Sequence, residues 1–203
     1  PADDEGGRVD VSLMYRAGYS SDVAAGDWFV ESGAFDYVVI REIMGNYSGT
    51  NHFGPYDTIT RAQVATILWR LAGSPASSVS QPFSDADPNE YYYNALCWAK
   101  EIGVSTGYSG TDSFGPNDPV TREQLATLFA RYASVVDGRD TSSDCSAMNS
   151  KNGADEVSDY AREAMGWAVD TGLIAGVNGT DLEPGGTAWR ASMAEMVKRY
   201  SSF

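Results

Sequence analysis

The stretch from residue 114 to residue 127 reads Phe114-Gly115-Pro116-Asn117-Asp118-Pro119-Val120-Thr121-Arg122-Glu123-Gln124-Leu125-Ala126-Thr127. An earlier copy runs from Phe53 to Thr66, and a more divergent copy runs from Leu182 to Glu195. Between Tyr47–Ala72 and Tyr108–Ala133, 15 of 26 positions are identical without a gap. The arginine of the stretch recurs after 61 and then after 68 residues. Self-similarity of this kind is typical of repeat architectures, so we expect three copies of one unit.

The second half of each copy predicts a helix with its own start signal. Thr60 and Thr121 are each followed three residues later by glutamine, Gln63 and Gln124, which is the spacing of a capping box. In the third copy Trp189 takes the cap position, and its side chain cannot accept the capping bond. Apolar residues then recur at three- and four-residue spacing, as on the buried face of an α-helix. They are Val64, Ala65, Leu68 and Leu71; Leu125, Ala126, Phe129 and Tyr132; and Met193, Ala194, Val197 and Tyr200.

A first helix and a turn precede each copy. In the second unit, one helical face carries Ala95, Trp98, Ala99 and Ile102. In the first unit Arg41 falls where Ile102 stands, so we expect a shorter or shifted helix there.

The turn after this first helix carries Gly107 in the second unit, Gly176 in the third and Asn46 in the first. Glycine, and after it asparagine, tolerates positive φ best. We therefore expect helix C-caps at these positions. Phe53 and Phe114 in the loop that follows are expected to anchor the core.

The motif Thr60-Arg61-Ala62-Gln63 and its copy Thr121-Arg122-Glu123-Gln124 resemble the Thr-Arg-Ala-Glu signature of the S-layer homology family, with Gln in the Glu position. In that family the signature follows a Phe-x-Pro loop, here Phe53-Gly54-Pro55. The resemblance implies a mainly α fold of three tandem helix-loop-helix repeats, packed as one pseudo-threefold domain. The implied repeats are residues 21–73, 83–134 and 154–203. Residues 1–20 stay unassigned, although Val9, Val11 and Leu13 alternate as in a short strand.

The charge of the chain limits its partners. It contains 14 Lys and Arg against 28 Asp and Glu, for a net charge of −14. Such a field repels nucleic acid and anionic membranes. No apolar run approaches the roughly 20 residues of a spanning helix. We therefore expect no nucleic-acid partner and no membrane insertion, and an anionic ligand would need local cations.

The inventory of reactive side chains is short. His52 is the single histidine, which excludes a multi-histidine metal site, and we expect no metal and no cofactor. No carboxylate pair or Ser-His-Asp arrangement stands out, so we expect no catalytic residues. The two cysteines, Cys97 and Cys145, favour a disulfide in an exported chain. The alternative is a Cys97 that faces the core.

Arg61, Arg122 and Arg190 are the strongest candidates for a binding role. Each stands in the first turn of a predicted helix, where the positive end of the helix dipole disfavours a cation. In one interpretation the guanidinium and free helix N–H groups form a pocket for a carboxylate or phosphate. In the other, each arginine clamps a carboxylate of a neighbouring unit, such as Asp57 or Asp118. A second arginine recurs nine residues later, on the opposite side of each helix, and is expected to be solvated or ion-paired.

Aromatic residues at the starts of the units are candidate sugar platforms, because apolar ring faces stack on pyranose C–H surfaces. Trp28 and Tyr92, with Tyr91 and Tyr93 beside the latter, lie where the family has its Trp or Tyr. The alternative is packing between units. Thr60, Thr121, Gln63 and Gln124 complete the candidate ligand-binding set.

The resemblance implies a module that anchors a bacterial surface protein non-covalently to the cell wall. Its implied ligand is an anionic, often pyruvylated, secondary cell wall polysaccharide bound in grooves between repeats. We expect a secreted, cell-surface chain that is monomeric as a three-repeat unit. The alternatives are an accessory domain of a wall hydrolase and a self-assembling structural domain that binds protein. Since Trp189 leaves the helix of Arg190 uncapped, we expect the third unit to bind worst.

Overall fold

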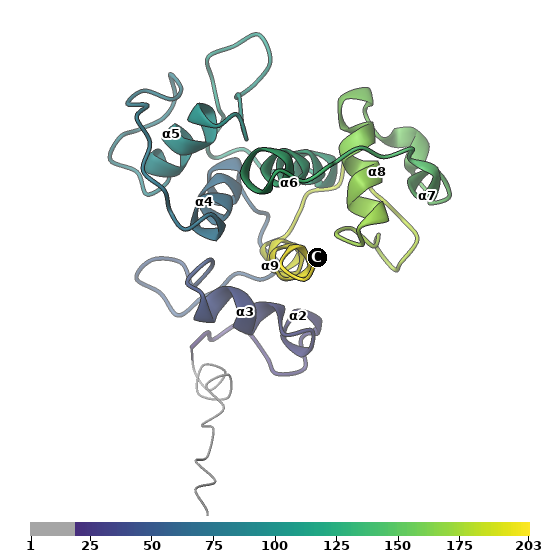
Figure 1. Ribbon diagram of the computed structural model, residues 1–203. Coiled ribbons are helices and arrows are strands. Elements are labelled where there is room, and N and C mark those ends of the chain that lie inside the picture. Colours follow the sequence, from purple (N-terminus) through teal and green to yellow (C-terminus); the bar gives the residue numbers. More distant parts are fainter. Residues whose placement is uncertain (1–18) are drawn as a thin grey trace, which may run out of the picture.

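The computed structural model describes residues 19–203, which form a cluster of short helices joined by loops (Figure 1). In chain order the helices are α2 (Trp28–Glu31), α3 (Ala34–Ile40), α4 (Arg61–Leu71), α5 (Tyr93–Glu101), α6 (Arg122–Asp137), α7 (Ser146–Asn149), η1 (Ala154–Glu156), η2 (Asp159–Ala161), α8 (Arg162–Asp170) and α9 (Arg190–Tyr200). Within this part of the chain, extended pairing is limited to isolated bridges. The predicted mainly α fold is confirmed. The alternating segment Val9–Leu13 lies outside the described residues.

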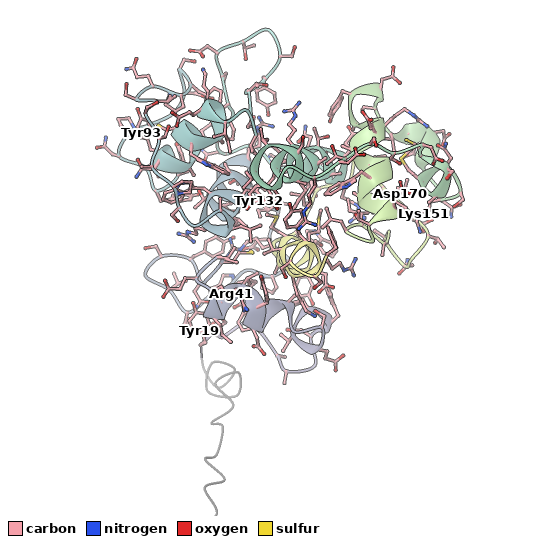
Figure 2. All side chains as sticks on the ribbon, in the orientation of Figure 1. Tyr19, Arg41, Tyr93, Tyr132, Lys151 and Asp170 are labelled. Atoms are coloured by element: carbon pink, nitrogen blue, oxygen red, sulfur yellow. The ribbon has the colours of Figure 1, made fainter. Side chains whose placement is uncertain are left out.

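Three helices of the repeated stretch, α4, α6 and α9, meet at the centre of the molecule (Figure 1). Helices α4 and α6 pack against the first helix of the following unit, α5 and α8 respectively. Helix α9 closes the cycle by packing against α3, the first helix of the first unit. Tyr132 of α6 lies between α6 and α9 (Figure 2), with its ring centroid 5.5 Å from that of Tyr200. The copies therefore share their hydrophobic contacts, and each helix pair joins two copies.

A ring of three backbone hydrogen bonds joins the copies just before these helices. The N–H of Ile59 donates to Ala188 O at 2.9 Å, that of Ala188 to Val120 O at 2.9 Å, and that of Val120 to Ile59 O at 3.0 Å. All three residues are buried, with at most 2% of their surface exposed. The bonds satisfy main-chain groups that have no water to replace them. The ring closes only when all three copies are present.

The helix starts agree with the sequence. Thr60 and Thr121 accept from the N–H of Gln63 and Gln124, and both glutamine side chains return the bond, which completes two capping boxes. Trp189 makes no side-chain cap bond. Helix α3 has 7 residues against 9 in α5, so the expected shortening of the first helix is confirmed. Phe53 and Phe114 are buried core residues as predicted.

The C-caps expected at the turn that recurs in the three copies are wrong. Gly107 has φ of 76° but lies well beyond the end of α5, and Gly103 takes the positive φ next to the helix. A Cβ at Gly107 would come within 2.6 Å of the carbonyl oxygen of Ser113, so close approach of the loop requires the glycine. Asn46 is not among the residues at positive φ. Its amide instead donates to Tyr19 O at 2.6 Å, which holds the start of the described chain.

The expected disulfide is also wrong, because both cysteines are free. Cys97 is buried in α5, as in the alternative interpretation. Cys145 is the residue before α7 and contacts the carbonyl oxygen of Arg162 at the start of α8. Helices α5 and α7 lie on opposite sides of α6 (Figure 1). A disulfide requires Cα atoms within about 7 Å of each other, so this arrangement does not allow one.

Candidate functional site

The three signature arginines join neighbouring copies. Each Nε donates to a main-chain carbonyl in the loop of the next unit, and the cycle closes from the third copy back to the first. The pairs are Arg61 with Phe114 O at 2.6 Å, Arg122 with Leu182 O at 2.7 Å, and Arg190 with Phe53 O at 2.7 Å. The clamp expected from the sequence exists, but its acceptor is a carbonyl rather than the carboxylate of Asp57 or Asp118.

The N–H groups at the helix starts are already occupied. At α4, the N–H of Arg61 donates to Asp118 O at 2.9 Å and that of Ala62 to Pro116 O at 3.0 Å. The third N–H, from Gln63, is held by the Thr60 cap. The two bonds to carbonyls recur at α6 and α9, with acceptors from residues 184, 186, 55 and 57, and the cap bond recurs at α6. The anion pocket expected from free helix N–H groups is therefore corrected, because any anion must be held by side chains.

Two equivalent grooves lie between copies. The first, which we call the Tyr108 groove, has a volume of about 460 Å³; its walls include Arg61, Tyr108, Gln124, Thr127, Arg131 and Tyr160. The second, the Tyr47 groove, has a volume of about 500 Å³; its walls include Arg190, Tyr47, Gln63, Thr66, Arg70 and Tyr91. Each of these six wall positions in one groove has its counterpart in the other. Volumes of this size suit small ligands.

The clamp arginine forms a fixed, charged wall in each groove. Its guanidinium carbon lies 4.4 Å from the ring centroid of Tyr108 in the case of Arg61, and 4.5 Å from that of Tyr47 in the case of Arg190. Burial lowers the pKa of both arginines, and the neighbouring tyrosines and carboxylates oppose that effect. Because the ordinary arginine pKa exceeds 12, both stay charged. The cation–π contact and the carbonyl bond hold each guanidinium in one orientation.

The tyrosine beneath each arginine is itself anchored. The hydroxyl of Tyr108 donates to Asp118 at 2.7 Å, and that of Tyr47 donates to Asp57 at 3.0 Å. Burial and the bond to Asp118 raise the pKa of Tyr108, while Arg61 opposes this. Both rings therefore stay neutral and in place.

Each groove also contains a second arginine, which we expected from the sequence to be solvated or ion-paired rather than part of a site. Arg131 lines the Tyr108 groove together with Arg61, and Arg70 lines the Tyr47 groove together with Arg190. The two arginines of one helix line different spaces, as their opposite positions on the helix predict. Each groove therefore combines a clamp arginine from the preceding copy with a second arginine from the following copy. Recurrence of this second arginine in all three copies was the signal that could have identified it.

The third interface, around Arg122 and the loop at Val177, differs from these two. Val177 replaces the stacking tyrosine, and Leu182 replaces the phenylalanine. Glu195 stands where the other helices have Thr66 and Thr127, and it forms an ion pair with Arg199 at 2.8 Å. This glutamate neutralises the cation that corresponds to Arg70 and Arg131. Arg122, rather than Arg190, therefore belongs to the divergent interface.

The remaining candidate residues separate into two groups. Gln63 and Gln124 line the grooves while completing the capping boxes, and Thr60 and Thr121 serve as caps.

Of the aromatic candidates, Trp28 is 43% exposed on α2, which contacts α9 at the third interface. Tyr92 is only 5% exposed and packs with Phe83 and Phe114, so its ring face is closed to a sugar. Its neighbour Tyr91, 58% exposed, lines the Tyr47 groove in its place.

Comparison with known proteins identifies the module. Residues 82–126 match the S-layer homology domain family. The chain contains an S-layer homology domain. The match covers all but the last residue of the second copy of the repeated stretch, including Arg122. The family match and the relatives described next support a cell-surface anchoring module in a cell-wall-associated protein.

Relatives of the S-layer homology chain include both surface-layer proteins and large enzymes. The surface-layer 125 kDa protein of Lysinibacillus sphaericus is 30% identical over 160 residues, 77% of this chain and 13% of that protein. The S-layer protein EA1 of Bacillus anthracis is 26% identical over 196 residues, which are 92% of this chain and 20% of that protein. The amylopullulanase of Thermoanaerobacterium thermosulfurigenes is 26% identical over 205 residues, which cover 95% of this chain and 11% of that enzyme. The chain thus spans at most a fifth of these relatives. Among residues 19–203, no helix is both long and apolar enough to cross a membrane.

Proposed function

We propose that this module anchors its parent protein by binding an anionic secondary cell wall polysaccharide in the Tyr47 and Tyr108 grooves. The observation that carries the proposal is the pair of arginines that faces each groove in a chain of net charge −14. The large negative net charge already favours solubility, so solubility does not explain two arginines in the lining of one groove. The proposal keeps three repeats, residues 21–73, 83–134 and 154–203, because the clamp bonds link the three copies in a closed cycle. That the three-repeat unit is a monomer stays a prediction.

The geometry suits a carboxylate carried on a sugar, such as a pyruvate ketal. Arg61 has its Nε committed to a carbonyl, which leaves its terminal nitrogens for a ligand in the Tyr108 groove. Arg190 also donates from one terminal nitrogen to Gly45 O, which leaves the other terminal nitrogen for a ligand in the Tyr47 groove. The second arginine supplies another positive charge in the lining of the same groove. Hydrogen bonds between charged partners of this kind contribute about 1.5–3 kcal/mol each. The exposed rings of Tyr91 and Tyr160 offer apolar faces for the pyranose at the end of each groove.

The third interface does not take part in anion binding under this proposal. Glu195 already occupies Arg199, and its carboxylate would repel an acidic sugar. Trp28 presents an exposed ring on α2, which contacts α9. The module therefore has two anion sites rather than three.

The arginines of the second position test the proposal, because they provide a matched set. We expect the double variant Arg70→Ala, Arg131→Ala to lower the affinity of each groove for purified wall polysaccharide about tenfold, because each groove loses one charged contact. Arg199→Ala removes the same side chain from the third helix and should change affinity less than about twofold. Isothermal titration calorimetry measures affinity, and thermal melting checks that each variant is folded.

Two outcomes would contradict the proposal. Unchanged affinity in the folded double variant would reject the grooves as the site. Equal losses in the double variant and in Arg199→Ala would indicate only a general charge effect. Removing the pyruvyl groups from the polysaccharide by mild acid should abolish binding to the wild-type chain, and retained binding would reject the ketal as the recognised acid.

A further inference from the structure

One wall of the Tyr47 groove rests on a histidine. The imidazole of His52 stacks beside the ring of Tyr47, with the ring centroids 6.0 Å apart and the ring planes at 22°. Tyr47 lines the groove and contacts the guanidinium of Arg190, whereas His52 is not among the wall residues. His52 therefore stands one side chain away from the ligand that we place in the groove.

Two carboxylates face the imidazole. Nδ1 of His52 lies 3.1 Å from Oδ2 of Asp22, in the segment before α2, and Nε2 lies 3.9 Å from Oδ2 of Asp57, in the loop before α4. Asp22 also accepts from two N–H groups of that loop, and Asp57 accepts from the hydroxyl of Tyr47 at 3.0 Å. The charged and titratable groups around His52 are thus these two carboxylates and Tyr47, with Arg190 of α9 beside the tyrosine.

The same two carboxylates act on Arg190. Burial lowers the pKa of Arg190, and two tyrosines together with Asp57 and Asp22 oppose that effect. The carboxylates therefore offset part of the positive charge that an anionic ligand meets in the groove. Histidine is the side chain that ordinarily changes its charge between pH 5 and 8. A protonated His52 balances the two carboxylates and leaves more of the Arg190 charge for the ligand.

The Tyr108 groove has the same frame without the histidine. Asp85 accepts from two N–H groups of the corresponding loop, and Asp118 accepts from the hydroxyl of Tyr108. Ser113 stands at the position of His52 and donates to Asp85 at 2.6 Å. A serine hydroxyl does not change its charge in this pH range. Because His52 is the single histidine of the chain, the two grooves should differ in their response to mild acid.

We propose that His52 is a positioning residue that makes anion binding in the Tyr47 groove tighter at mildly acidic pH, whereas binding in the Tyr108 groove changes little. This inference rests on the proposed function. The protonated imidazole acts through the carboxylates of Asp22 and Asp57, and so through the tyrosine and the arginine that they hold. The neutral imidazole leaves both carboxylates to oppose an acidic sugar. The module then has one site that responds to pH and one that does not.

The test reads one groove at a time by weakening the other. Arg131→Ala weakens the Tyr108 groove and Arg70→Ala the Tyr47 groove, each about tenfold. The probe is a 4,6-pyruvylated methyl hexoside, which stays ionised because ordinary carboxyl pKa values lie near about 3–4. Calorimetric titration should show binding about threefold tighter at about pH 5.5 than at about pH 7.5 in the Arg131→Ala chain. The Arg70→Ala chain should change less than about 1.5-fold.

Two substitutions exchange the behaviour of the grooves. The side chain of His52 is 50% exposed, so His52→Ser, which copies the second unit, should fold. It should remove the pH response of the Arg131→Ala chain. Ser113→His should give the Arg70→Ala chain a response of similar size. Salt at about 1 M, where charges are screened beyond about 3 Å, should suppress the response in both. Thermal melting at both pH values checks that each variant is folded.

The outcomes separate this inference from the function on which it rests. Equal pH responses in the Arg131→Ala and Arg70→Ala chains would overturn the role of His52 while leaving both anion sites intact. A response that survives His52→Ser in the folded chain would overturn it as well. Failure of the pyruvylated sugar to bind either chain at either pH would overturn the anion sites themselves, and this inference with them.

Discussion

A chain that ends at Asp137 is expected to be unfolded, although it keeps two complete copies of the repeated stretch. The physical reason is that α3 packs against α9, which belongs to the third copy. The shortened chain also loses the carbonyl of Ala188, which accepts from Ile59, and the clamp bond of Arg190 to Phe53 O. Helix α9 buries Met193, Met196, Val197 and Tyr200, at about 1.5–3 kcal/mol for each large side chain. That loss is comparable to the whole stability of a domain, about 5–15 kcal/mol.

Circular dichroism at 222 nm during heating would measure this prediction. The intact chain should melt cooperatively, and the shortened chain should show no transition. Adding a second fragment, residues 138–203, should restore helical signal, because the interactions between copies are non-covalent. A cooperative transition in the shortened chain alone would show that two copies suffice, contrary to the closed ring of bonds.

Local features of this fold were predictable from the sequence because their causes lie within a few residues. The capping boxes need only Thr60 and Gln63, or Thr121 and Gln124, and both formed as expected. Helix faces follow from spacing of apolar residues, so Leu68 and Phe129 were correctly placed in the core. The shortened α3 followed from one polar residue, Arg41, at an otherwise apolar position.

What could not be predicted depends on how the copies meet. The sequence placed the divergent site at Arg190, since its own helix lacks a cap. In the structure the groove at each arginine is completed by the next copy, so Arg190 shares the Tyr47 groove and Arg122 the divergent interface. The aromatic platform expected at Tyr92 was wrong for a similar reason. Helix α5 begins at Tyr93, which turns Tyr92 into the core and leaves Tyr91 in the groove.

The clamp role of the arginines leads to the second large effect, on stability rather than on binding. We expect Arg190→Ala to lower the free energy of unfolding by about 3 kcal/mol and Arg122→Ala by about 1.5 kcal/mol. Arg190 makes two hydrogen bonds to carbonyls, to Phe53 O at 2.7 Å and Gly45 O at 2.8 Å, and stacks on Tyr47. Arg122 makes one such bond, to Leu182 O. The difference corresponds to one charged hydrogen bond and a cation–π contact.

Chemical denaturation of both variants measures the difference, and Arg190→Ala should also lower the melting temperature by roughly 6–12 °C. Arg190→Lys is the informative control, because it keeps the charge but lacks the planar fork that reaches two carbonyls. It should recover less than half of the lost stability. Equal losses in Arg190→Ala and Arg122→Ala would contradict a contribution from the second bond and the stack. Unchanged stability in both would contradict the clamp itself, and would return the signature arginines to a role in ligand binding alone.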